Sequence, residues 1–75
     1  MVKPTRVTND IRSLRAAHGD MTQAELARRI GVTRQTIIAI EQGRYSPTLE
    51  LAFRIARVFG VPLDDVFSYP SDSED

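Results

Sequence analysis

Residues 21–44 decide the fold, and they read MTQAELARRIGVTRQTIIAIEQGR. Thr22 and Glu25 have the spacing of a capping box, in which the Thr22 hydroxyl accepts from the Glu25 amide and the Glu25 carboxylate returns the bond. This pattern predicts a helix that begins at residue 23. Its apolar residues share one face: Leu26, Ala27 and Ile30. Gly31 then stands where a chain leaves a helix through a left-handed residue.

A second helix follows at once. Thr33 is a good N-cap for residues 34–42, and Gly43 ends them. Because only residues 31–33 join the two helices, the helices must cross steeply, as in a helix-turn-helix. Small and apolar residues are available for the crossing: Ala27, Leu26, Ile30, Val32, Ile37 and Ile40. Together these residues indicate a helix-turn-helix far more specifically than any one of them does alone.

The flanking sequence also predicts helices. Asn9 caps a helix that extends to about residue 18, and Thr48 caps residues 49–59, which Gly60 closes. Pro62 opens a short helix over about 63–67. No run alternates long enough for a strand, so the fold class is all-α. We expect an N-terminal arm at 1–8, a domain at 9–67, and an acidic, disordered tail at 68–75.

Composition narrows the function. A chain of 75 residues has room for one small core. With no cysteine and a single histidine, His18, it lacks thiolate metal ligands, a cysteine nucleophile and a multi-histidine site. We therefore expect neither an enzyme nor a metal protein. No apolar run approaches the length of a membrane span, and the first residues do not resemble a signal peptide. We expect a cytoplasmic protein.

Charge is divided unevenly along the chain. Residues 1–44 hold eight basic and four acidic side chains, a net charge of +4. Residues 45–75 hold two basic and six acidic side chains, a net charge of −4. The asymmetry favours an anionic partner for one face, although chance variation in a small domain would explain it equally well.

The residues quoted above, together with 58–67, resemble the DNA-binding domain of Cro/CI-type phage repressors and XRE-like bacterial regulators. The resemblance spans residues 9–67. It implies a compact five-helix, lambda-repressor-like domain that needs no cofactor, and a protein located at the nucleoid. One departure is the turn at residues 19–21, which is one residue longer than is common in that family.

The resemblance also implies that the start of the helix over 34–42 enters the major groove. Arg34 and Gln35 lie on its outward face and suit guanine and adenine edges. Ile38 and Ala39 lie beside them, where thymine methyl contact and a plain surface role remain equally open. We predict DNA base contacts for four residues: Arg34, Gln35, Ile38 and Ala39.

Other residues suit phosphates, which fix the register of a protein on DNA without reading its sequence. Gln23 begins a helix, where amides and the helix dipole favour an anion, and the family places a matching glutamine on the DNA backbone. We predict phosphate contacts for six residues: Gln23, Thr33, Thr36, Gln42, the amide of Gly43, and Arg44. Arg28 and Arg29 are interpreted as a solvated helix face.

Two further roles follow from the same resemblance. Arg15 and Glu41 match family positions that form an ion pair between the first and third helices, and we predict a structural role for them. His18 is interpreted as a surface or helix-terminal cation and not as a ligand.

The helix over 49–59 indicates a partner. A helical wheel directs Leu49 to the core with Ala52, Ile55, Ala56 and Phe59, and leaves Leu51 and Val58 outside that arc. We predict a homodimer interface from Leu51, Val58, Phe67 and Tyr69. A dimer on a two-fold symmetric operator suits a protein whose single reading helix covers few base pairs.

These features predict a sequence-specific, double-stranded DNA-binding regulator that acts as a repressor. No membrane or small-molecule partner is indicated. An antitoxin or a restriction-modification controller fits the same sequence. A protein-interaction module that has lost DNA binding is the alternative from another class, and Arg34, Gln35 and Arg44 argue against it.

Overall fold

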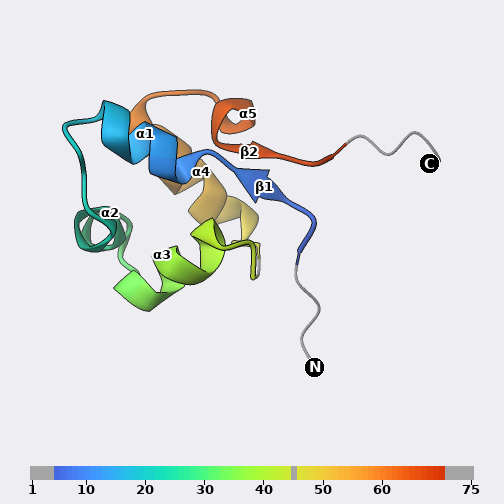
Figure 1. The fold of residues 1–75 in the computed structure, drawn as a ribbon, viewed down its shortest axis with the longest axis horizontal. Coiled ribbons are helices and arrows are strands. Elements are labelled where there is room, and N and C mark those ends of the chain that lie inside the picture. Colours follow the sequence, from blue (N-terminus) through green and yellow to red (C-terminus); the bar gives the residue numbers. More distant parts are fainter. Residues whose placement is uncertain (1–4, 45, 71–75) are drawn as a thin grey trace.

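The computed structural model describes residues 5–44 and 46–70, and these form a small helical bundle with one pair of very short strands (Figure 1). The helices are α1 (Ile11–Ala17), α2 (Gln23–Ile30), α3 (Arg34–Glu41), α4 (Leu49–Phe59) and α5 (Leu63–Val66). The strands are β1 (Thr8–Asn9) and β2 (Phe67–Ser68). No helix in this part of the chain is long and apolar enough to cross a membrane.

Helix starts follow the predicted threonine caps. The hydroxyls of Thr22, Thr33 and Thr48 accept from the amides of Glu25, Thr36 and Leu51. The capping box is only half formed, however, because the Glu25 carboxylate turns to the arginines of its own helix.

The turns also follow the sequence. Gly31 closes α2 with φ of 76°, a left-handed conformation that a side chain would strain. In the longer turn after α1, Gly19 and Asp20 are both left-handed, with φ of 71° and 56°. This is the place of the extra residue noted in the sequence.

The strand pair corrects the prediction that the chain has no strand. Thr8 pairs with Ser68 and Asn9 with Phe67 in antiparallel register, so residues of the predicted arm and tail are joined to each other. Asn9 therefore lies in β1 and α1 begins at Ile11, although the Asn9 side chain still accepts from the Ile11 amide. Phe67 likewise belongs to β2 and not to the last helix. Residues 1–4 of the predicted arm and residues 71–75 of the predicted tail lie outside the described residues.

The core lies where α2, α3 and α4 meet and is closed by α1 and α5. Its fully buried large side chains come from every helix: Ile11, Leu26, Ile30, Ile37, Ile40, Ile55 and Val66. His18 joins α1 to α4, with one ring nitrogen 2.9 Å from the Leu14 carbonyl and the other 3.1 Å from the Phe59 carbonyl. Its ring also packs edge-on against Phe59. This histidine is thus a structural bridge.

The predicted core face of α4 is confirmed except at its first residue. Ala52, Ile55, Ala56 and Phe59 are buried as expected, whereas Leu49 is 66% exposed. Leu51 and Val58, expected outside that face, are half-buried and pack against the core. Phe53, to which the sequence assigned no role, is 53% exposed. Three large apolar residues lie within the first five positions of the helix, so the sequence alone does not decide which of them is covered.

Candidate nucleic-acid interface

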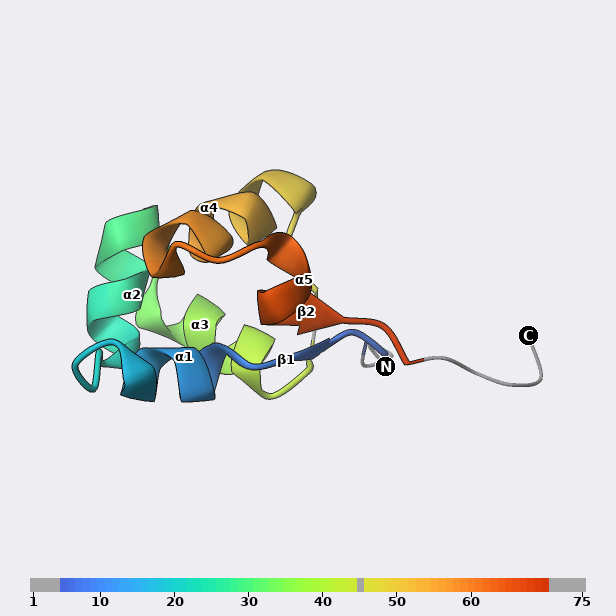
Figure 2. The same cartoon turned by 90° about the horizontal axis from the view of Figure 1, so that it is seen from above.

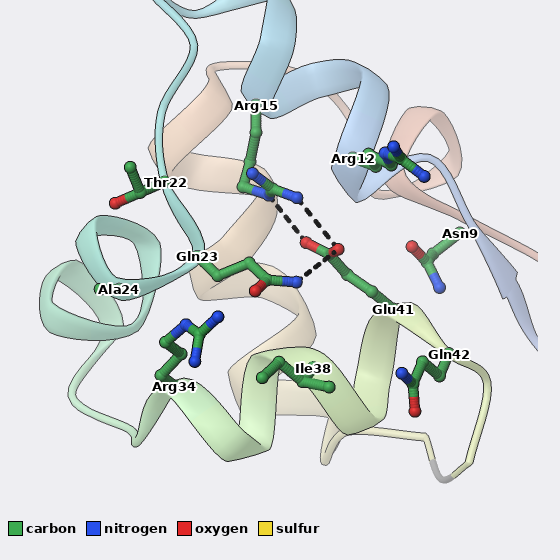
Figure 3. A pocket seen from close by; sticks show the side chains of 10 residues that line it. All are labelled: Asn9, Arg12, Arg15, Thr22, Gln23, Ala24, Arg34, Ile38, Glu41 and Gln42. Carbon is green, nitrogen blue, oxygen red and sulfur yellow. Dashed lines mark hydrogen bonds and ion pairs between the residues drawn. The ribbon is translucent and has the colours of Figure 1, made fainter.

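A broad groove lies between α1, the start of α2 and α3 (Figure 3). Its volume is about 860 Å³, and it is open on one side. Among its lining residues are three arginines and one glutamate: Arg12, Arg15, Arg34 and Glu41. Because Arg15 neutralises the glutamate, Arg12 and Arg34 leave the groove with an excess of positive charge.

The predicted ion pair holds α3 against α1. Arg15 donates from Nε to Glu41 Oε2 at 2.8 Å and from Nη2 to Glu41 Oε1 at 3.1 Å, a bidentate contact. Its third nitrogen donates to the Met21 carbonyl at 2.8 Å. The two side chains are only 15% and 9% exposed. Such a pair fixes both distance and orientation between the helices.

Two amide side chains add to this support. Gln23 donates from Nε2 to Glu41 Oε1 at 3.2 Å, which ties the start of α2 to the end of α3. Asn9 donates to the Ile40 carbonyl at 3.0 Å. Gln23 retains a second amide N–H and its carbonyl oxygen, so its predicted phosphate contact remains chemically open. The side chains of Gln23 and Asn9 therefore hold α3 in place in the absence of a ligand.

The predicted base readers divide into two neighbouring stripes of α3. Arg34 and Ile38 line the groove, together with Gln42 (Figure 3). Gln35 and Ala39 do not line it and lie on the adjacent stripe; Gln35 is exposed and Ala39 half-buried. The groove and the outer face of α3 thus form one continuous surface of mixed cationic, amide and apolar character.

Apart from Gln23 at the start of α2, the predicted phosphate residues lie near the two ends of α3. The hydroxyls of Thr33 and Thr36 are 3.0 Å apart and bond to each other. Arg44 is exposed just beyond the helix. The Gly43 amide donates to the Ile40 carbonyl at 3.0 Å and so helps to close the helix, and its predicted phosphate contact stays a prediction.

The remaining charges of α2 behave as interpreted from the sequence. Arg28 and Arg29 are exposed and pair with Glu25 at 2.6 and 2.7 Å. The hydrogen bond from Arg28, and then that from Arg29, lowers the pKa of Glu25 from 4.5 to about 2. These groups lie outside the groove lining.

Arg12 is the groove residue that sequence reasoning missed. It stands one turn before Arg15 on α1 and projects over the groove rim (Figure 3). A basic residue three positions before the ion-paired arginine was the available signal. Within the described residues, no cluster of three histidine, cysteine or acidic side chains is placed to hold a metal.

Comparisons with known proteins agree with this geometry. A helix-turn-helix family model matches residues 11–66. An uncharacterized HTH-type transcriptional regulator of Methanocaldococcus jannaschii is 53% identical over 64 residues, covering 85% of this chain and 96% of that protein. The cryptic phage CTXphi transcriptional repressor RstR of Vibrio cholerae is 40% identical over 67 residues, covering 89% of this chain and 57% of the repressor.

Solved structures give the same fold. The hypothetical transcription factor NHTF of Neisseria superposes with a TM-score of 0.69 at 30% identity, covering 80% of this chain and 68% of that one. A Bacteroides fragilis protein gives a TM-score of 0.72 over 83% of this chain and 98% of its own, at 21% identity. The second likeness concerns the fold alone.

Proposed function

The chain belongs to the XRE-like helix-turn-helix family, whose relatives are named as transcriptional regulators and not as enzymes, and from that premise we propose that it binds double-stranded DNA sequence-specifically and represses transcription. The observation that carries the proposal is the groove. Its only lining carboxylate is neutralised by Arg15, and cationic and amide groups remain facing outward. Such a surface suits a polyanion whose base edges offer hydrogen bonds.

In the proposed complex α3 enters the major groove. An α-helix with its side chains is about 10–12 Å in diameter, and the major groove is about 12 Å wide. Arg34 would bond to the O6 and N7 of guanine, and Gln35 to the N6 and N7 of adenine. Ile38 would pack on a thymine methyl group. Gln23, Arg44 and the threonines at the start of α3 would contact the flanking phosphates.

We further propose that two copies bind side by side on a two-fold symmetric operator, with their reading helices about 34 Å apart. Of the residues predicted for the contact between them, Leu51, Val58 and Phe67 pack against their own core, and Tyr69 is exposed. A contact this small gives weak association in free solution, so the DNA supplies most of the coupling. Repression rather than activation is supported by the likeness to RstR.

Selection of bound duplexes from a random pool tests the proposal. We expect an enriched site with two inverted half-sites spaced by one turn of DNA. A pool that is bound but not enriched would reduce the function to non-specific binding. A pool that is not bound at all would favour the protein-interaction module.

A further inference from the structure

The outer face of α4 is an unusual surface for a small monomer. Phe53 lies at its centre with Glu50 and Arg57 at helical spacing on either side. Leu49 lies along one edge of this stripe, and the exposed Arg54 lies along the other. Both apolar side chains are more than half exposed. The core side of the same helix is fully used by Ala52, Ile55, Ala56 and Phe59. An exposed phenylalanine surrounded by charges is typical of a protein contact.

The charges on this face match a second copy of the face itself. Glu50 and Arg57 are exposed, and neither forms an ion pair with any described residue. Seven positions along a helix span about 10 Å, so the two cannot pair within one chain. In an antiparallel pair of α4 helices with its two-fold axis between 53 and 54, Glu50 of each copy lies opposite Arg57 of the other. The two Phe53 rings then meet near the axis.

Other arrangements are less favourable. A parallel pair would place Glu50 against Glu50 and Arg57 against Arg57, which repel each other. The antiparallel pair also sets the positive end of each helix dipole beside the negative end of the other. The exposed Arg54 beside this face lies next to the axis, opposite Phe53 of the other copy, where a cation can lie against the aromatic ring. Glu50 and Arg57 thus complement each other across the pair, which favours a second copy over an unrelated partner.

The position of α4 gives this pairing a consequence for DNA. Figure 2 shows α4 on one side of the bundle and α1 on the other, with α3 between them. In Figure 3 the α4 ribbon runs behind the groove, away from its open side. Two copies joined through α4 would therefore leave both grooves free and direct them apart. This arrangement is different from two copies side by side on one operator.

We propose that the α4 face, formed by Leu49, Glu50, Phe53 and Arg57, is a self-association surface that joins two copies back to back and so holds two DNA segments together. Self-association stands without DNA, whereas the bridging rests on the proposed function. The contact is small, well below the size of a stable interface, so it is weak for free chains and strengthened when several copies share one DNA molecule.

A charge exchange tests the pairing. Glu50→Arg and Arg57→Glu each place like charges at both contacts, and each variant should associate about tenfold more weakly than the original chain in sedimentation at millimolar concentration. An equimolar mixture of the two variants restores both opposite pairs, and so does the double variant E50R/R57E. Both should regain association. Asp64→Arg makes the same charge change at an exposed site on α5 and should have no effect.

Three results would contradict the pairing through α4. Single variants that associate like the original chain, a mixture that stays monomeric, or an original chain that shows no association at millimolar concentration would each overturn the pairing. Helical circular dichroism, together with binding of each variant to one duplex, controls for loss of fold.

Bridging is measured by immobilising one duplex from the random-pool selection and counting a second, labelled copy retained by the protein. The original chain and the variant mixture should retain it, and each single variant should not. Single variants that bind one duplex and still bridge would contradict the role of α4 while leaving the proposed function intact. If no duplex is bound at all, the proposed function fails, and sedimentation alone decides the α4 pairing.

Discussion

Glu41 and Glu25 both have arginine partners among the described residues, and the two carboxylates have different structural roles. Glu41 lies between helices, almost covered, and receives bonds from Arg15 and Gln23. Glu25 lies on the surface of α2 and pairs with two arginines of its own helix. The first arrangement fixes α3 relative to α1 and α2, and the second supports only one helix. The same ion-pair chemistry thus positions α3 in one place and stabilises a single helix in the other.

Removing the carboxylate of Glu41 should have the largest effect on stability. Glu41→Ala leaves Arg15 partly buried without its partner and releases Gln23, which should lower the free energy of unfolding by about 3 kcal/mol. Urea denaturation measures it. The matched control is Glu25→Ala, which removes exposed pairs and should cost far less. If the two variants lost equal free energy of unfolding, the half-buried pair of Arg15 and Glu41 would contribute no more to stability than the exposed pairs of Glu25.

Arginines that face outward should act on DNA rather than on stability. Arg34→Ala should weaken binding to the selected site by about 1–3 kcal/mol and relax preference at one base position, with unfolding unchanged. Arg28→Ala, which removes another exposed arginine, on α2 and outside the groove, is its control. An unchanged ratio of binding to selected and scrambled duplexes would remove Arg34 from the base readers.

Arg44 should contact a DNA phosphate and not a base. Because it lies just past α3, Arg44→Ala should weaken binding about equally on all sequences and reduce the slope of log affinity against log salt by about 1. Titrations at several salt concentrations measure it. A changed sequence preference with the original salt slope would contradict a phosphate role.

The smallest expected effect is the pH dependence of stability that comes from Glu25. Arg28 and Arg29 lower the pKa of Glu25 from 4.5 to about 2, so the folded state favours the charged form. The resulting stability is present above pH 4.5 and is lost as the pH falls toward about 2. Thermal unfolding of the original chain and of Glu25→Gln should therefore differ slightly at pH 6 and converge near pH 2. A difference that stays constant with pH would exclude the ion pairs as its source.

The sequence predicted those features that are set by neighbouring residues. Threonine caps and left-handed glycines are local signals, and they located α2, α3 and α4 closely. The strand pair joins Thr8 to Ser68, two residues long on each side, and no periodicity marks so short a strand. The exposure of Leu49 was missed because the run Leu49–Phe53 is apolar at four of five positions, so packing by distant elements decides which of these side chains are buried.

The candidate site, like the fold, was predicted only in part. The resemblance supplied the pair of Arg15 and Glu41, which the structure contains. It did not supply the bond from Gln23 to Glu41 or the place of Arg12, since both depend on how three helices meet around the groove. The amide of Gly43 helps to close α3, and its predicted phosphate contact stays a prediction.

The central claim is that α3 presents Arg34 to a guanine edge in the major groove. A double-mutant cycle tests it, with Arg34→Ala on the protein and 7-deazaguanine, which lacks N7, at each guanine of the selected half-site in turn. At one guanine the original chain should lose affinity on substitution while the Arg34→Ala variant loses none, a coupling of about 1–3 kcal/mol. Equal losses for both proteins at every guanine would contradict the claim.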